Sequence, residues 1–294
     1  MTDAPALRLD SPVAIGGVGG SGTRLFARIL LELGFHIGSD LNDSLDNLWF
    51  PLLFKRPEVL DGSDADFCSL FTIFRKAMHG SDALSEAEIR LIRAAAAEPR
   101  PQHDVEWLSQ RAESLVRVCA GPARQNPRWG WKAPNTHIVL PQLSNLVPGI
   151  RYIHIARNGL DMAYSQNQNQ LETWGTRFLG TDSIAVTPRF SLKYWVAVHR
   201  RVIETARHMK GRFLLVNYDV LCADPWGKLP ALIEFLGFDP SPARLAATAK
   251  LVRSPAGIGR FKAFPPDHFD PQDVAFVRRM GFDTEWPATV CRPT

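Results

Sequence analysis

Cysteine is scarce and scattered in this sequence of 294 residues. The four cysteines are Cys68, Cys119, Cys222 and Cys291, and no two of them form a CxxC pair. Their spacing excludes a zinc ribbon and a dense disulfide framework. We therefore expect reduced, buried thiols, as is usual in a cytoplasmic protein.

Long apolar segments are also missing. No stretch approaches the roughly 20 apolar residues that a membrane-spanning helix needs. The N-terminal sequence MTDAPALRLD lacks the charged and apolar regions of a signal peptide. We expect a soluble, cytoplasmic protein without a membrane span.

Charge of one sign is not in large excess either. The formal net charge is +4, from 34 Lys and Arg against 30 Asp and Glu. So small a surplus argues against a nucleic-acid partner, although it suits a site for a small anion. The oligomeric state stays open, a homo-oligomer included.

What the sequence does contain is an alternation of strand and helix patterns. Short strands are expected at residues 13–15, 128–134, 152–156 and 212–218, with helices between them. Residues 40–127 carry many aromatic and charged side chains and two helical patterns, at 85–97 and 104–120, which predict a helical insertion. Residues 170–189 show no period and are interpreted as a loop. The alternation predicts a single α/β domain over residues 1–294, with a central parallel sheet.

Glycine is concentrated at one point. Five glycines and a serine occupy residues 16–22, between the first strand and a helical pattern that ends at Gly34. Glycines let several backbone N–H groups converge, and the helix N-terminus adds positive potential there. The stretch therefore predicts a loop that binds an anion.

This loop partly matches two nucleotide-binding patterns. Gly17, Gly19 and Gly22 satisfy the GxGxxG of dinucleotide-binding proteins, but so glycine-rich a loop matches many spacings by chance. Gly17 and Gly22 also fit the start of a Walker A loop. Thr23 and Arg24 then occupy its Lys and Ser/Thr positions, which argues against ATP hydrolysis.

A second anion site is predicted from the stretch YIHIARNGLDMAYSQ. Arg157 follows a strand, and Ser165 lies eight residues further on, where we expect a helix. A guanidinium and a hydroxyl at that spacing can meet at one phosphate. A hydride-transfer enzyme needs no second phosphate clamp of this kind, so the dinucleotide interpretation is disfavoured.

Together these motifs resemble the sulfotransferases that use 3′-phosphoadenosine 5′-phosphosulfate (PAPS). The resemblance spans about residues 13–282 in the family's order. It rests on Ser21-Gly22-Thr23, on Arg157-Asn158 with Asp161 and Ser165, and on Tyr218-Asp219, Leu221 and Asp224-Pro225 before a helix that ends in EFLGF. It implies a three-layer, P-loop-like α/β fold with a helical lid, PAPS as the sulfuryl donor and PAP as its product.

The resemblance also implies roles for single residues. Asp161 is expected to cap or orient rather than to bind, and RSPAGIGRFKAF resembles the family's C-terminal loop. The residues expected to hold the cofactor are Gly19, Gly20, Ser21, Gly22, Thr23 and Arg24 at the 5′-phosphosulfate, Arg157, Ser165, Arg253, Arg260 and Lys262 at the 3′-phosphate, and Tyr218 near the adenine.

Sulfuryl transfer needs positive charge at the transferred group and a base for the acceptor. Gly20 stands where many relatives have a Lys or Arg, so Arg24 and Lys132 are expected to supply that charge. Lys132 matches the lysine that precedes the acceptor site in relatives. The chemistry requires no metal ion.

The base is open among several residues. Pro134, which cannot act, stands where many relatives have a histidine. His137 is one candidate, although a histidine on a helix surface is the plainer interpretation. Other relatives use a carboxylate after the first helix; Asp40 is our first choice there and Asp46 the second, although such Asp, Asn and Ser clusters usually cap loops.

The acceptor is expected to be a hydroxyl or amine of a small molecule, carbohydrate or lipid. Trp49, Phe50 and Phe54 belong either to the core or to an apolar wall of its site. Two other functions remain open from the sequence: a nucleotide-dependent kinase with a degenerate P-loop, and a non-catalytic nucleotide-binding scaffold.

Overall fold

A four-stranded sheet is the centre of the fold. The computed structural model describes residues 11–80, 82–124 and 128–287, and its strands β1 (Val13–Gly17), β2 (Gly130–Lys132), β3 (Arg151–Ala156) and β4 (Phe213–Asn217) form a parallel sheet in the order β2-β1-β3-β4. In the β1–β2 pair, Val13 lies opposite Gly130 and Ile15 opposite Lys132. The expected α/β fold with a central parallel sheet is confirmed.

Burial explains why these short segments are strands. Every residue of β1, β2 and β3 is buried, as in parallel sheets that are covered on both faces. The edge strand β4 is only partly buried.

The chain divides into two compact units. Unit 1 comprises Met1–Gly16, Thr23–Ile153 and Gly211–Phe213, and unit 2 comprises Gly17–Gly22, His154–Lys210 and Leu214–Thr294. The expectation of one domain over the whole chain stays a prediction.

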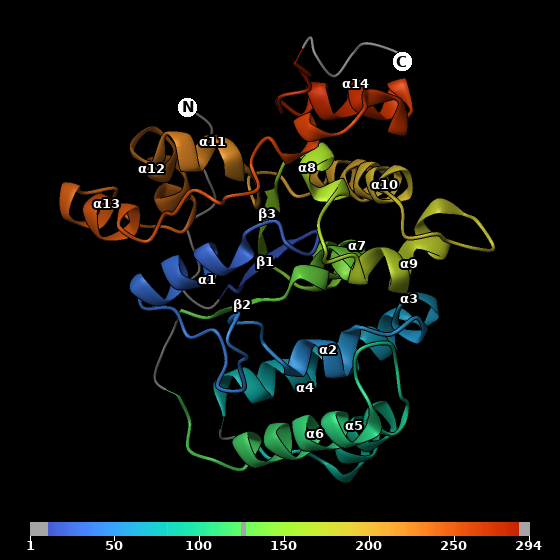
Figure 1. Ribbon diagram of the computed structural model, residues 1–294. Helices are drawn as coiled ribbons and strands as arrows, with labels where there is room; N and C mark the ends of the chain where they lie inside the picture. The colour runs from blue at the N-terminus through green and yellow to red at the C-terminus, as the bar shows by residue number, and fades with distance from the viewer. Residues whose placement is uncertain (1–10, 81, 125–127, 288–294) are drawn as a thin grey trace. The chain divides into compact units, whose positions relative to one another are not determined.

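Unit 1 carries the helical insertion. Its helices are α1 (Thr23–Glu32), α2 (Trp49–Phe54), α3 (Glu58–Asp61), α4 (Asp64–His79), α5 (Glu86–Ala97), α6 (Val105–Cys119), the 3₁₀ helix η1 (Pro134–Val139) and α7 (Leu140–Leu146). Helices α2, α4, α5 and α6 pack on one another (Figure 1). Ser63 and Ser85 begin α4 and α5 with capping boxes, which satisfy the first backbone N–H groups of each helix. The helices expected at 85–97 and 104–120 are thus confirmed.

Aromatic side chains fill the centre of that helical layer. Phe50 and Phe54 of α2 pack against Phe74 of α4, and Phe74 meets the ring of Trp131 from β2 with centroids 5.2 Å apart. Trp49, Phe50 and Phe54 are all at most 2% exposed. Of the two interpretations left open by the sequence, these residues fit the core.

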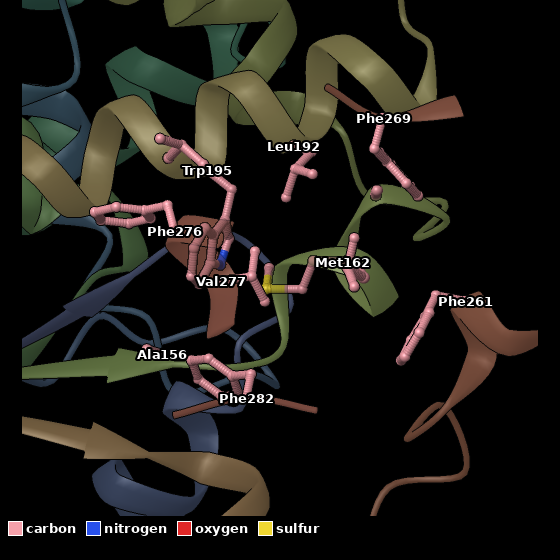
Figure 2. Packing of buried hydrophobic residues seen from close by; sticks show 12 residues of the cluster. Ala156, Met162, Leu192, Trp195, Phe261, Phe269, Phe276, Val277 and Phe282 are labelled. Atoms are coloured by element: carbon pink, nitrogen blue, oxygen red, sulfur yellow. The ribbon is translucent and has the colours of Figure 1, made fainter. Parts of the chain in front are cut away.

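Unit 2 carries the second set of helices. They are α8 (Gly159–Ala163), α9 (Asn169–Leu179), α10 (Pro188–Ala206), α11 (Tyr218–Ala223), α12 (Pro225–Phe235), α13 (Pro242–Ala249), the 3₁₀ helices η2 (Arg260–Ala263) and η3 (Pro266–His268), and α14 (Pro271–Arg279). Figure 2 shows Met162 of α8, Trp195 of α10 and Phe276 of α14 in one buried cluster, which also includes Phe261 of η2.

Three expectations from the sequence are wrong. Residues 169–179 form α9 rather than a loop, because Leu171 and Trp174 bury one face and Gly180 ends the helix in a left-handed conformation at φ 63°. Ser165 is not helical, since α8 already ends at Ala163. Among the cysteines, Cys119 is buried but Cys68 is exposed; Cys291 lies outside the described residues.

Within the described chain, no helix is long and apolar enough to span a membrane.

Candidate functional site

The glycine loop Gly17–Gly22 adopts backbone conformations that side chains resist. Gly20 has a φ of 88° and Gly22 a φ of 94°, values that favour glycine. A Cβ on Gly22 would also lie closer than 3.0 Å to the ring of Tyr218. The loop is closed by a hydrogen bond from the N–H of Ser21 to the carbonyl of Val18 at 3.0 Å.

Ser21 gives the loop a buried polar group. The residue is 1% exposed, and its hydroxyl has no hydrogen-bond partner among the described residues. Buried hydroxyls normally have a partner. An oxyanion held at the loop would provide one.

A second segment of unit 2 faces this loop. A Cβ on Gly20 would lie 3.7 Å from the hydroxyl oxygen of Ser165, and a Cβ on Gly19 would lie 3.3 Å from Oδ1 of Asn167. The side-chain amide of Gln170 donates to the Gly17 carbonyl at 3.2 Å. Ser165 therefore lies beside the glycine loop even though its predicted helix is absent.

Arg157 lies just beyond β3 and is held by an acid. Its Nε is 3.8 Å from Oδ1 of Asp219, whose other oxygen accepts the N–H of Asn158 at 3.0 Å. Burial raises the pKa of Asp219, while the N–H of Asn158 and the charge of Arg157 oppose the rise. Asn158 itself caps α8 through a hydrogen bond from the N–H of Leu160.

The C-terminal loop brings a second guanidinium to Arg157. A Cβ on Gly257 would lie closer than 3.0 Å to terminal nitrogens of both Arg157 and Arg260, so both side chains converge on this glycine. Arg260 also donates to the carbonyl of Tyr164 at 3.0 Å. Two converging guanidiniums repel each other unless an anion lies near them. Arg157 and Arg260, both predicted at the 3′-phosphate, thus lie together, and their role in binding it stays a prediction.

Asp161 fixes that loop, in keeping with its expected orienting role. Its carboxylate accepts the N–H of Gly259 at 2.8 Å and the N–H of Phe261 at 3.0 Å. These two bonds bracket Arg260. The residue is 2% exposed, so its hydrogen bonds are little screened by water.

Two other predicted phosphate ligands do not join the arginine pair. The ammonium of Lys262 lies 2.6 Å from the carboxylate of Asp283. Arg253 donates to the carbonyls of Lys250 and Val252 at 2.7 and 2.8 Å. Tyr218, expected near an adenine, lies against the loop at Gly22. The binding roles of all three stay predictions.

A second polar cluster lies in unit 1, around Lys132 at the end of β2. The side chain of Lys132 is 3% exposed, and its Nζ lies 2.6 Å from Oδ1 of Asp46 and 3.1 Å from the carbonyl of Ser44. Arg24 donates to the hydroxyl of Ser44 at 2.6 Å. Arg24 and Lys132, the two cations proposed from the sequence, thus both contact one short segment, residues 44–46.

The local fold of that segment explains how it presents its acceptors. The side-chain oxygen of Asn42 accepts the N–H groups of Ser44 and Asp46, both at 2.9 Å, as in Asx turns. Leu45 between them has a φ of 62°, a left-handed conformation that is uncommon for a residue with a side chain.

The electrostatics of Lys132 follow from this cluster. Burial lowers the pKa of Lys132, Asp46 opposes that shift, and the nearby charge of Arg24 adds to it. Its ammonium is therefore easier to deprotonate than that of an exposed lysine.

The other proposed bases lie elsewhere in unit 1. Asp40 forms an ion pair with Arg111, with Nε and Oδ2 3.3 Å apart. His137 is 1% exposed within η1, so it is a buried residue and not the helix-surface residue of the plainer interpretation. Asp46, the second choice from the sequence, is the carboxylate that contacts Lys132.

Several contributing residues were missed from the sequence. Arg111 and Asn167 had no assigned role, and Asp219 was noted within its motif. Asn42 and Ser44 were considered only as part of a loop-capping cluster, and the hydrogen bonds of Asn42 agree with that interpretation. The pairing of Arg111 with Asp40 joins helix α6 to a distant loop and leaves no local pattern.

Comparisons with solved structures found several that are similar to this chain. They include the sulfotransferase domain of the Synechococcus PCC 7002 olefin synthase, at 14% identity and a TM-score of 0.49, covering 97% of this chain and 100% of that one. Sulfotransferase STF9 from Mycobacterium avium matches at 15% identity and a TM-score of 0.45, over 97% and 79% of the two chains.

The family assignment rests on sequence. A search of curated proteins found no match. The model of the family described as "Sulfotransferase family" matches residues 12–242, a range that includes both polar clusters except the C-terminal loop. The chain therefore belongs to the sulfotransferase family.

Proposed function

We propose that this protein transfers a sulfuryl group from PAPS to a hydroxyl or amine of a small molecule, carbohydrate or lipid. The observation that carries the proposal is the position of Ser165 beside the glycine loop, where its hydroxyl oxygen would lie 3.7 Å from a Cβ on Gly20. Two anion-binding elements that are well separated in the sequence meet in unit 2. A nucleotide with anionic groups at two positions needs such a pair.

The residues present fit PAPS. The loop Gly17–Gly22 offers backbone N–H groups and the buried Ser21 hydroxyl, which suit the 5′-phosphosulfate. Arg157, Arg260 and Ser165 offer two guanidiniums and a hydroxyl, which suit the 3′-phosphate. When bound, PAPS supplies the activated sulfuryl group and PAP is the leaving group.

The cluster in unit 1 supplies the remaining roles. Lys132 and Arg24 contribute positive charge for a transition state in which negative charge builds up on the leaving oxygen. Asp46 is assigned as the base that takes the acceptor's proton, since it lies beside the proposed cation Lys132, whereas the cation beside Asp40 is Arg111, which has no assigned role in the transfer. Because Asp46 bonds to the ammonium of Lys132, the two side chains position each other.

The donor can be tested by binding. We expect PAP to raise the melting temperature of the purified protein and ATP with Mg²⁺ to leave it unchanged. Arg157→Ala should weaken PAP binding about ten- to a hundredfold, because a hydrogen bond to a charged group contributes about 1.5–3 kcal/mol. Arg207→Ala, which removes an exposed arginine that pairs within its own helix, is the matched control.

Transfer is tested separately, with labelled PAPS and a mixed panel of hydroxyl and amine acceptors. Incorporation of label into an acceptor is the expected result. Stabilisation by ATP with Mg²⁺ alone would point to a kinase instead, and tight PAP binding without transfer to any acceptor would point to a non-catalytic scaffold.

A further inference from the structure

Lys55 in unit 1 is a buried cation whose ammonium contacts an amide oxygen. It follows the last turn of α2 and is 7% exposed. Its ammonium donates to the side-chain oxygen of Gln102. Among the residues that the structure describes, no carboxylate forms an ion pair with it. Buried charges are costly unless they are paired, and an amide oxygen supplies only a partial negative charge.

The charges around Lys55 add to this imbalance. Arg100 lies beside it and donates to the carbonyls of Pro51 and Leu52 at the end of α2, at 2.9 and 3.2 Å. Burial, and then the charge of Arg100, lower the pKa of Lys55 to about 8. Burial, and then the charges of Lys55 and Arg100, lower the pKa of His103 to about 4. The charges of Asp46 and Asp104 act in the opposite direction on Lys55 and His103, but among the described residues neither carboxylate forms an ion pair with Lys55.

A short segment joins Lys55 to the candidate catalytic cluster: the N–H of Asn47, next to Asp46, donates to the carbonyl of Lys132 at 2.8 Å, and α2 leads from there to Lys55. In keeping with this, the charge of Asp46 raises the pKa of Lys55 against the effect of burial. Asp46 is already bound to Lys132 and accepts the Asn42 amide at 3.0 Å, so it is not available as the ion-pair partner of Lys55. The charge of Asp46 thus acts on two buried lysines, Lys55 and Lys132.

The segments that bind the two lysines each contain a residue with strained backbone. In the described part of the chain, three residues other than glycine have positive φ: Leu45, Gln102 and Lys210. Leu45 separates the two groups that bind Lys132, and Gln102, at a φ of 73°, provides the oxygen that binds Lys55. Strained backbone of this kind costs about 1–3 kcal/mol and is concentrated at functional sites.

We propose that Lys55 is a specificity residue that pairs with an anionic group, a carboxylate or a phosphate, on the acceptor. The inference rests on the proposed function and names the class of acceptor: a molecule with a nucleophilic hydroxyl or amine and a separate negative charge. Gln102 holds the ammonium in place until the acceptor's anion joins it. Arg100 fixes the end of α2 from which Lys55 projects and adds positive potential.

A purely structural lysine would behave differently. Replacing a buried charge by an apolar side chain of similar length often leaves a protein as stable or makes it more stable, and such a change would not alter the choice between acceptors. The informative result is therefore a preference of the enzyme for acids over esters that is lost when the ammonium of Lys55 is removed.

The test compares matched acceptors that differ in charge and by only one or two methyl groups. Hydroxyphenylpropanoate and ω-hydroxydodecanoate are each assayed against their methyl esters, and ω-hydroxydodecyl phosphate against its dimethyl ester. In the wild-type protein we expect kcat/KM to be about ten- to a hundredfold higher for the preferred acid than for its ester. The carboxylate and phosphate arms show which anion is taken.

Three variants complete the experiment. Lys55→Met should abolish the acid-to-ester ratio by raising KM for the acid, with PAP affinity unchanged. Lys55→Arg should keep most of the preference, which shows that charge rather than folding is responsible. Lys228→Met, at an exposed lysine of α12, should leave the ratio as in the wild type.

The outcomes separate the two proposals. Equal turnover of acids and esters by the wild type, or a preference that survives Lys55→Met, would overturn the role of Lys55 while leaving sulfuryl transfer intact. If PAP binds but no acceptor of the panel is sulfated, the proposed function fails. The role of Lys55 would then still be supported if the acids, but not their esters, stabilise the PAP complex against heat, and overturned if neither does.

Discussion

The carboxylate of Asp161 accepts the backbone N–H of Gly259 at 2.8 Å, although 98 residues separate them in the sequence. The other carboxylate oxygen of Asp161 accepts the N–H of Phe261 at 3.0 Å. Arg260 lies between the two anchored residues and reaches Gly257, where Arg157 also arrives. One buried acid therefore determines whether two guanidiniums converge.

Asp161→Asn should weaken PAP binding about tenfold. Asparagine has a single acceptor oxygen for the two N–H groups, and its NH₂ group would face the second N–H. One charge-assisted hydrogen bond of about 1.5 kcal/mol is therefore lost. Isothermal titration with PAP measures the effect, and the melting temperature should fall by several degrees because the residue is buried. Asp182→Asn, at an exposed carboxylate, is the control. An unchanged PAP affinity in a folded Asp161→Asn protein would show that the loop is held by other contacts.

Gly22→Ala should remove PAP binding and destabilise the fold. The new Cβ would clash with the Tyr218 ring and force alanine to a φ of 94°, and we expect a loss of about 2–4 kcal/mol in the free energy of unfolding. Urea denaturation gives that value. Gly281→Ala is the matched control, because Gly281 has a φ of 82° but no atom within 4 Å of its Cβ. Equal losses in the two variants would mean that strain alone, and not the contact with Tyr218, explains the glycine.

Lys132→Met and Asp46→Asn should each lower kcat far more than they weaken PAP binding. Both remove one side of a 2.6 Å pair, and the loss of a general base or of charge stabilisation costs about a hundredfold or more in rate. Steady-state kinetics on any acceptor found active, with PAP titration alongside, separate the two effects. Asp40→Asn is the comparison: a larger loss of kcat there than in Asp46→Asn would return the role of base to Asp40.

The sequence predicted those parts of the fold whose signals are local. The strand before the glycine loop and helices α5 and α6 were expected from local patterns, and the loop's composition requires close backbone approach. Helix α9 was missed because Gly175 interrupts its pattern and the helix is short, although Leu171 and Trp174 bury one face.

The candidate site was predictable as a set of residues but not as an arrangement. Arg157, Ser165 and the glycine loop were identified because each lies at the end of a strand or in a short motif. The choice between Asp40 and Asp46 depended on partners far along the chain, Arg111 and Lys132. Lys55 gave no signal at all, because a lysine's burial depends on tertiary packing alone.

The stability of the protein should depend on pH through Lys55. Burial lowers the pKa of this lysine from its ordinary 10.5 to about 8 in the folded protein. Between these two pH values the unfolded chain holds a proton that the folded chain has released, so raising the pH across this window favours the folded state. Below pH 8 both states are protonated, and the cost of burying the ammonium is then fully present.

Lys55→Met removes that cost and its pH dependence. The difference in unfolding free energy between the variant and the wild type should therefore shift in favour of the wild type as the pH rises from below 8 toward 10.5, by about 1–3 kcal/mol. Urea denaturation of both proteins at the two ends of this range measures the shift. Lys132 also has a lowered pKa, but it is present in both proteins and cancels in the comparison. Lys228→Met should show no such shift, and a pH-independent difference for Lys55→Met would mean that Lys55 titrates as an exposed lysine does.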